Sequence, residues 1–313
     1  MLGRTAGGLY WLFRYLERAE NTARLIEVGE RIALTRSRRG DDEWASILAT
    51  TGCTEGFESV HDELTGANVI DYMLRDRTNP SSVLSTIKAA RDDGRMVRTA
   101  LTREVWEAVN ACYLSLTEAL ARKLALRDVP DVLQLIRDRT AFVRGTMAGT
   151  MLRDEVYDFA RIGTFLERAD YTARLLDVKY YVLLPTAGMV GSDLDNVQWD
   201  TILRSLSAES SYRAIHGHEI SPREIARFLV FDRRLPRSLA FCYAKLRANL
   251  GYLCETYGAR SRSMEMVETL NDELGRWTID KVFARGLHET TQELLGIHAR
   301  LGRQIETDYR FTG

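Results

Sequence analysis

The chain carries nearly the same helical segment twice, 150 residues apart. Residues 16–28 read Leu-Glu-Arg-Ala-Glu-Asn-Thr-Ala-Arg-Leu-Ile-Glu-Val, and residues 166–178 read Leu-Glu-Arg-Ala-Asp-Tyr-Thr-Ala-Arg-Leu-Leu-Asp-Val, with nine of thirteen positions identical. Because this spacing is about half of the 313 residues, the repeated unit is half of the protein and not a short solenoid module. The repeat predicts two tandem helical bundles, residues 1–150 and 151–313, that pack as one compact unit about a pseudo-two-fold axis.

Weaker echoes of the first half support this duplication. Each recurs 155 or 156 residues later, which pairs Trp44 with Trp199, His61 with His216, Asp76 with Asp232, Pro80 with Pro236, Ser82 with Ser238 and Arg91 with Arg247. The offset only grows along the chain, so short insertions are expected in loops of the second half. The stretch 185–197, which is rich in turn residues, is the clearest of these.

The rest of the sequence indicates an all-α protein. It has only five prolines, its apolar residues recur every three or four positions, and no stretch alternates with the period of two that a half-buried strand needs. Turn signals predict about five or six helices in each half, with breaks at 38–41, 79–80, 92–94, 129–130 and 235–236.

Composition excludes several classes of protein. The 43 Lys and Arg residues balance 44 Asp and Glu residues, so the chain lacks the clustered positive charge that nucleic-acid binding requires. No apolar run approaches the roughly 20 residues of a membrane span, and no signal peptide is recognisable, so we expect a cytoplasmic protein. The cysteines form no Cys-x-x-Cys pair and are expected to be buried free thiols at Cys53, Cys112, Cys242 and Cys254.

The repeated helix places an apolar stripe beside a charged row. The stripe includes two alanines that allow a neighbouring helix to approach closely, and it consists of Leu16, Ala19, Ala23 and Ile26, with the counterparts Leu166, Ala169, Ala173 and Leu176. About 100° around the helix lies a row of two acids and one arginine, formed by Glu17, Glu20 and Arg24 in the first copy and Glu167, Asp170 and Arg174 in the second.

Two interpretations of this charged row stay open. The acids and arginines could form a buried ion-pair network that fixes the register of two related helices. Alternatively, they converge on a ligand or a partner, because isolated surface pairs would contribute under about 1 kcal/mol and would give little reason for two matching sets.

Residues 10–24 and 165–174, with their shared Leu-Glu-Arg-Ala core, resemble the bacterial Alpha-E family, an all-helical domain with characteristic glutamates. The resemblance implies a protein encoded beside, or fused to, circularly permuted ATP-grasp proteins, often with transglutaminase-like proteins nearby, in systems proposed to form or cleave peptide-like amide bonds. The motif residues carried over by position are Glu17, Arg18, Glu20 and Arg24 in the first copy and Glu167, Arg168 and Arg174 in the second. Asp170 and Tyr171 stand where the first copy has Glu20 and Asn21, so the two copies are not strictly equivalent.

From this resemblance we expect an accessory or substrate-binding partner of an ATP-grasp-type ligase, with ATP and magnesium bound by the partner protein. The alternative is a stand-alone enzyme that uses the paired acids and arginines for acid and base chemistry. The sequence has no phosphate loop, nucleophile elbow or His-Glu-x-x-His motif. We expect no metal site, because the Glu-x-x-Glu spacing on the repeated helix has no histidine in step with it.

Weaker candidates lie outside the repeated helix. Asp76 and Asp232 each precede a proline by four residues and are typical of turns and caps, and Arg91 and Arg247 belong to the same echo. The aromatic and basic face at Tyr10, Trp11, Arg14 and Tyr15 could bind the partner or pack in the core.

Overall fold

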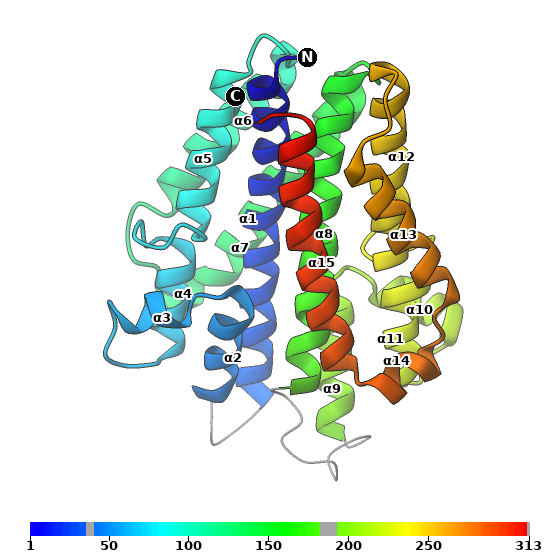
Figure 1. Cartoon of the computed structure of the whole chain (residues 1–313). Helices are drawn as coiled ribbons and strands as arrows, with labels where there is room; N and C mark the ends of the chain where they lie inside the picture. The colour runs from blue at the N-terminus through cyan, green and yellow to red at the C-terminus, as the bar shows by residue number, and fades with distance from the viewer. Residues whose placement is uncertain (36–40, 182–192, 312–313) are drawn as a thin grey trace.

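The computed structural model describes residues 1–35, 41–181 and 193–311, and in these ranges the regular secondary structure is entirely helical, with turns and loops between the helices (Figure 1). They contain fifteen α-helices, one short 3-10 helix and no strand, which confirms the all-α prediction. The helices of the first half are α1 (Gly3–Thr35), α2 (Asp41–Thr51), α3 (Thr54–Glu58), α4 (Gly66–Leu74), α5 (Val83–Met96), α6 (Arg103–Ala119), η1 (Leu126–Asp128) and α7 (Val129–Thr150). Those of the second half are α8 (Glu155–Tyr181), α9 (Asp193–Ser205), α10 (Glu209–His216), α11 (Pro222–Phe231), α12 (Leu239–Tyr257), α13 (Arg262–Arg276), α14 (Ile279–Arg285) and α15 (Leu287–Asp308).

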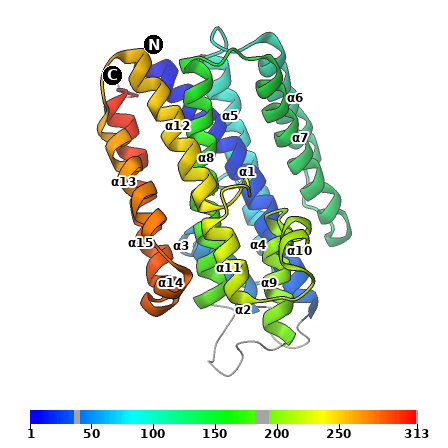
Figure 2. The same cartoon turned by 90° about the vertical axis from the view of Figure 1, so that its right-hand side faces the viewer.

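The two longest helices, α1 and α8, lie side by side at the centre of the bundle. Helices α5 and α7 pack against α1, and α12 and α15 pack against α8, while α6 and α13 form the outer layer on either side (Figure 2). Helices α1 and α8 approach closely where they cross, because a Cβ atom on Gly163 would lie 2.2 Å from the carbonyl oxygen of Tyr10. Only glycine fits there, so the central contact depends on backbone proximity.

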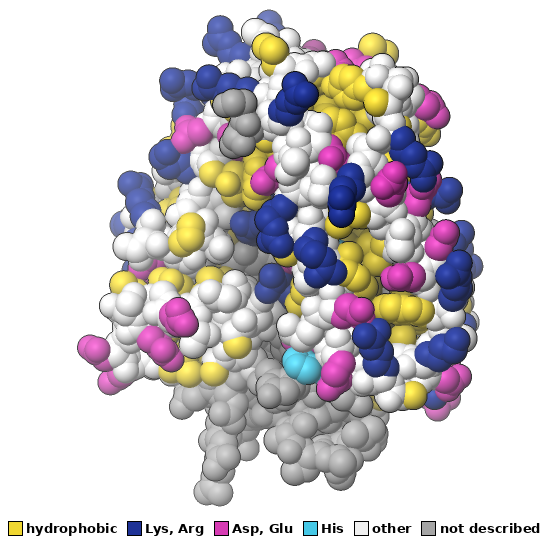
Figure 3. Space-filling model, viewed as in Figure 1, with side chains coloured by type: hydrophobic (Ala, Val, Ile, Leu, Met, Phe, Trp, Pro, Cys, Tyr) yellow, Lys and Arg dark blue, Asp and Glu magenta, His cyan; other side chains and the backbone are white. Residues whose placement is uncertain are grey.

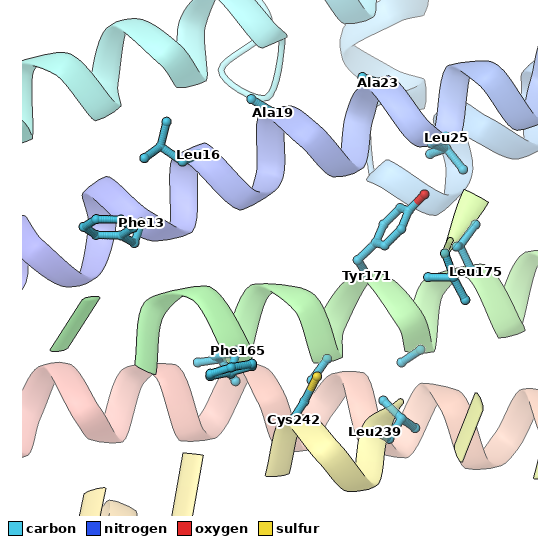
Figure 4. Close-up of a cluster of buried hydrophobic side chains, with 14 of the residues drawn as sticks. Phe13, Leu16, Ala19, Ala23, Leu25, Phe165, Tyr171, Leu175, Leu239 and Cys242 are labelled. Atoms are coloured by element: carbon cyan, nitrogen blue, oxygen red, sulfur yellow. The ribbon is translucent and has the colours of Figure 1, made fainter. Parts of the chain in front are cut away.

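The predicted apolar stripes are buried. Every member is at most 1% exposed in α1 and 0% exposed in α8. In Figure 4, Leu16, Ala19 and Ala23 point away from α8, toward the side of α1 that α5 covers. The alanines therefore serve packing within one half of the chain, and a different face of α1, which carries the charged row, meets α8.

The helices that follow the two Asp–Pro echoes begin in the same way. Ser82 caps α5 by accepting a hydrogen bond from the backbone N–H of Ser85 (3.2 Å), and Ser238 caps α12 by accepting one from Phe241 (3.1 Å). Hydroxyl oxygens at this position satisfy backbone donors that the first helical turn leaves free. Both helices thus begin three residues after the proline, at the residue that follows the serine.

Three features of the predicted helix boundaries are wrong. The turn expected at 92–94 lies inside α5, because Gly94 is buried against Leu12 and α6, and one glycine in a helix costs only about 1 kcal/mol. The halves contain seven and eight α-helices, more than the five or six expected. Of the expected loop at 185–197, residues 185–192 lie outside the described residues, while residues 193–197 form the first turns of α9. The break at 38–41 falls largely outside them as well.

Aromatic packing at the start of α1 decides between the two interpretations of Tyr10. Its side chain is fully buried against Trp11 and Phe311, so it belongs to the core and cannot contact a partner. Trp11 and Tyr15 are only partly buried. The cysteines have no disulfide partner; Cys53, Cys112 and Cys242 are buried and Cys254 is partly exposed. Among the helices described, none is long and apolar enough to cross a membrane.

Candidate functional site

The Glu-Arg pairs of the two repeated segments bind each other across the contact between α1 and α8. Arg18 donates from Nε and Nη2 to the two oxygens of Glu167, at 2.6 and 3.0 Å. Arg168 donates from the same two atoms to the two oxygens of Glu17, both at 2.9 Å. Such two-point contacts fix the relative position of both groups, so each helix holds the other through matching ion pairs.

The first acid pair, Glu17 and Glu20, is enclosed by arginines. Both residues are buried, with 0% and 1% of their surface exposed. Arg237, from the segment before α12, lies 3.0 Å from Glu17 and 2.6 Å from Glu20, and Arg144 of α7 contacts both carboxylates. Arg24 donates to Glu20 at 2.9 Å. Four arginines, Arg168 included, therefore surround two carboxylates.

Ion pairing keeps these carboxylates charged. Burial alone would raise the pKa of Glu17, but the guanidinium groups of Arg168, Arg237 and Arg144 lower it well below its ordinary value. Burial would also raise the pKa of Glu20, yet Arg237 and Arg144 lower it to about 2. Both groups are thus permanent anions at neutral pH.

The second acid pair, Glu167 and Asp170, has fewer cationic partners. Arg14 donates to Glu167 at 2.8 Å beside Arg18, and Arg174 donates to Asp170 at 2.7 Å. Burial opposes ionisation of both acids, but the arginines around Glu167 lower its pKa, and His298 with Arg174 lowers that of Asp170. These two carboxylates are also charged at neutral pH.

His298 of α15 links this pair to the core of the second half. Its Nδ1 lies 3.7 Å from Asp170, and its Nε2 lies 2.6 Å from the hydroxyl oxygen of Tyr243. The imidazole is buried, so its orientation is fixed by the tyrosine and by the packing around it.

A cavity of about 200 Å³ borders the second acid pair. Its wall combines carboxylate, guanidinium, amide and hydroxyl groups with two aliphatic side chains, those of Leu25 and Met73. The lining residues are Arg18, Asn21, Thr22, Leu25, Thr50, Thr51, Met73, Ser81, Glu167, Asp170, Tyr171 and Arg174. Asn21 is only 4% exposed, and its Nδ2 has no hydrogen-bond partner among the described residues.

A larger hollow of about 1,140 Å³ lies at the other end of the bundle, near both chain ends. It is lined mainly by apolar and backbone groups, including Phe159, Tyr257 and Phe311, and carries neither acid pair. The charged candidates from the repeated helices that border a cavity, Arg18, Glu167, Asp170 and Arg174, are therefore at the smaller one.

The weaker candidates lie apart from the acid pairs. Asp76 accepts hydrogen bonds from the backbone and hydroxyl of Thr78, and Asp232 accepts one from the backbone of Arg234, so both form local turns. Arg91 donates to Asn110 at 2.9 Å and stacks on Tyr113, and Arg247 is exposed. No ion pair or hydrogen bond of the described residues connects these four side chains to Glu17, Glu20, Glu167 or Asp170.

Three arginines of the network were not assigned to it from the sequence. Arg14 was considered only as part of an aromatic face, and Arg144 and Arg237 were not singled out. Nothing in the sequence connects Arg144 with the acid pairs, because it lies on α7, outside the repeated segments. Arg237 does give one: it stands between the echoed residues Pro236 and Ser238, where the first half has Ser81 between Pro80 and Ser82.

No group of three or more His, Cys, Asp or Glu side chains in the described residues is arranged to hold a metal ion. The four carboxylates between α1 and α8 face arginines, and His298 contacts only one of these carboxylates, that of Asp170. The observed contacts of these carboxylates are therefore mainly ion pairs with guanidinium groups.

Comparison with known proteins matches the chain to a family. Residues 1–309 match Alpha-E, described as a predicted alpha-helical domain with a conserved ER motif. Glu-Arg, the dipeptide that these letters denote, occurs at 17–18 and 167–168, where it forms the reciprocal ion pairs, and also at 30–31. The chain is 26% identical to an uncharacterised protein of Mycobacterium bovis and 26% and 25% identical to those of two Mycobacterium tuberculosis strains. Each match covers 95% of this chain but 35% of the relative, and no solved structure matches significantly.

Proposed function

This chain belongs to the Alpha-E family, and we propose that it is the substrate-binding or site-completing partner of an ATP-grasp-type ligase that forms or modifies peptide-like amide bonds. In this proposal the chain works in the cytoplasm, does not bind ATP itself, and relies on a circularly permuted ATP-grasp protein for ATP and magnesium. A transglutaminase-like protein is a further possible member of the same system.

We also propose that the chain arose by duplication of one bundle, with residues 1–150 and 151–313 as the two copies. The reciprocal ion pairs of Arg18 and Arg168 support this origin. So do the matching contacts of Arg24 with the carbonyl of Ser205 (2.8 Å) and of Arg174 with the carbonyl of Thr50 (2.5 Å). In each copy, the arginine four residues after the second acid thus reaches into the other half.

The ionisation of the acids supports a binding role over acid–base catalysis. A general acid or base works best when its pKa lies near the working pH. Arginines lower the pKa values of Glu17, Glu20 and Glu167, and His298 with Arg174 lowers that of Asp170. Lowered values are the opposite of what proton transfer at neutral pH requires. The stand-alone enzyme is therefore the weaker alternative.

The observation that carries the binding role is the cavity beside Glu167 and Asp170. Binding sites for small molecules are concave and combine apolar walls with a few fixed polar groups. This cavity has fixed carboxylates and guanidinium groups and the apolar side chains of Leu25 and Met73, and at about 200 Å³ it suits a ligand of amino-acid size. A ligase of peptide-like bonds uses substrates of this kind.

The surface offers a region where a protein partner could dock. Figure 3 shows Lys and Arg side chains gathered in the middle of the face that α15 crosses, next to a hydrophobic band between α15 and α13. Arginines and aromatic residues are enriched in protein interfaces. The curated relatives extend well beyond this region, since the chain spans about a third of their length, so further chain accompanies the domain there.

Co-purification tests the proposed partnership. We expect the chain, expressed with the ATP-grasp protein encoded in its own genome, to elute as a stable complex that buries more than roughly 1,000 Å². We expect no ATP hydrolysis by the isolated chain and activity of the ligase only with both proteins present. Separate elution of the two proteins, or turnover of ATP by the chain alone, would contradict the proposal.

A further inference from the structure

We propose that the cavity beside Glu167 and Asp170 binds a guanidinium-bearing ligand of amino-acid size, in the position that Arg237 fills at the other acid pair. This inference rests on the proposed function for the ligand's role as a substrate, whereas the binding itself is a property of the isolated chain. The argument compares the surroundings of Arg237 with those of the cavity.

Arg237 shows how the chain accommodates a guanidinium group beside an acid pair. Its side chain is 8% exposed and contacts Glu17 and Glu20 at 3.0 and 2.6 Å. It also donates to the side-chain oxygen of Asn21 at 3.1 Å, and its backbone carbonyl accepts a hydrogen bond from Thr172. The guanidinium group therefore bridges the two carboxylates and is fixed from both sides.

The corresponding position in the first half is a serine. Both segments have an aspartate four residues before a proline and a serine two residues after it. This aligns Asp76, Pro80 and Ser82 with Asp232, Pro236 and Ser238, and places Ser81 opposite Arg237. A serine side chain is too short to reach the acid pair, and Ser81 instead lines the cavity. The space is present because no arginine extends into it.

The wall of the cavity repeats the groups that surround Arg237. The paired groups have the same place in the sequence repeat, and they are Glu167 for Glu17, Asp170 for Glu20, Tyr171 for Asn21, Arg18 for Arg168, Arg174 for Arg24 and Thr22 for Thr172. Asp170 is one methylene shorter than Glu20, which leaves more depth for a ligand. Leu25 and Met73 supply apolar surface against which the methylene groups of an arginine-like chain can pack.

The local excess of arginines does not argue against a cationic ligand. At the first acid pair, Arg237 is held although three other arginines also face Glu17 and Glu20. Burial lowers the pKa of Arg237, but only to about 10, so the group stays charged at neutral pH. At the second pair, three arginines face the two acids and His298 lies 3.7 Å from Asp170, so one more guanidinium group would bring the number of guanidinium groups to the four of the first pair.

The remaining polar groups of the cavity suit the other end of such a ligand. Within the described part of the chain, Asn21 donates no hydrogen bond from Nδ2, although its side-chain oxygen accepts one from Arg237. Arg174 is 37% exposed and lies beside the partly exposed Thr50 and Thr51. An amide donor and a guanidinium group are the partners that a carboxylate needs, and buried polar atoms are rarely left without one.

Calorimetric titration of the full chain tests the assignment with four probes. We expect L-arginine and agmatine, which lacks the carboxylate, to bind, with L-arginine the tighter of the two. L-citrulline, whose neutral urea group replaces the guanidinium, should bind at least about tenfold more weakly, since an ion-paired contact is lost. Acetate should not compete. Equal binding of citrulline, competition by acetate, or no binding of L-arginine at about 10 mM would overturn the proposal.

A substitution locates the site. Ser81→Arg should place a guanidinium group in the cavity and remove L-arginine binding, while Ser59→Arg, which adds the same charge at an exposed position outside the cavity, should retain it. Thermal unfolding of both variants reports whether they are folded. Binding by a folded Ser81→Arg variant would overturn the location. Binding of L-arginine together with failure to find an ATP-grasp complex would instead leave the site intact and refute the proposed partnership.

Discussion

The acid pairs Glu17–Glu20 and Glu167–Asp170 lie on nearly identical helical segments and yet differ in their surroundings. The first is closed by four arginines, whereas the second has three and borders a cavity. The difference comes from residues outside the repeated segments. A shared helix motif can thus build a closed structural ion-pair cluster at one place and an open site at another.

Two positions outside the repeated segments differ between the surroundings of the two acid pairs. Arg237 is matched by Ser81, as the sequence echo indicates. Helices α7 and α15 both have 22 residues, and the sixteenth residue is Arg144 in one and Gly302 in the other. A Cβ atom on Gly302 would lie 3.4 Å from Arg14, which occupies this side of the second pair. At the second pair, Arg14 of α1 therefore takes the place that Arg144 has at the first pair, whereas no described residue takes the place of Arg237.

The largest effect is expected from removing Arg237. Arg237→Met leaves Glu17 and Glu20 buried with fewer partners, which should lower the free energy of unfolding by about 3–5 kcal/mol. Ser81→Ala at the matching position should change it by less than about 0.5 kcal/mol. Urea denaturation measures both values. Similar effects of the two substitutions would show that the first pair is not the closed structural cluster described here.

The two glutamates of the Glu-Arg pairs should also differ. Glu17→Gln leaves Arg168 without its charge partner and Arg237 with Glu20 alone, and the two arginine side chains are only 12% and 8% exposed, so we expect a loss of about 3 kcal/mol. Glu167→Gln affects Arg14 and Arg18, which at 14% and 28% exposure can be solvated more easily, and should cost about 1–2 kcal/mol. Denaturant unfolding of the two variants side by side distinguishes them, and a reversed order would contradict the comparison.

Low pH should weaken the first pair. The pKa of Glu20 is about 2 in the folded protein and about 4.3 in an unfolded chain, so the stabilisation is complete above pH 4.3 and is lost as the pH falls through 2. The difference in unfolding free energy between the wild type and Glu20→Gln should therefore shrink by about 1–2 kcal/mol from pH 6 to pH 3. A difference that stays constant over this range would show that Glu20 is not held ionised by its arginines.

The smallest effect is expected for ligand binding at moderate pH. The pKa values of Glu167 and Asp170 lie below their ordinary values, so both acids stay charged from pH 5.5 to 8. The affinity for L-arginine should change by less than about twofold over this range, because no group in contact with the guanidinium changes its charge. Calorimetric titration at several pH values measures it. A tenfold loss by pH 5.5 would mean that another titrating group controls binding.

The sequence predicted the helical architecture because its signals are local. Apolar spacing and the scarcity of proline favour helices, and the duplicated segment identified Glu17, Glu20, Glu167 and Asp170 before any contact was known. Gly94 misled the prediction, since a glycine in a helix is tolerated when neighbouring side chains fill the space beside it.

The surroundings of the acids could not be predicted in the same way. Arg144 reaches Glu17 and Glu20 from another helix, and its role depends on tertiary packing that leaves no trace in local periodicity. The cavity is likewise a tertiary feature. Its one sequence signal is that Ser81 stands opposite Arg237, between a proline and a serine that both segments share, so departures from a repeat are as informative as its matches.

A crystal structure of the chain grown with L-arginine tests the difference between the acid pairs most directly. We expect the guanidinium group of the ligand within about 3 Å of the carboxylates of Glu167 and Asp170, and no ligand at Glu17 and Glu20, where Arg237 occupies the space. An empty cavity would contradict the assignment. So would L-arginine bound in the reverse orientation, with its carboxylate, and not its guanidinium group, at the second acid pair and its arginines.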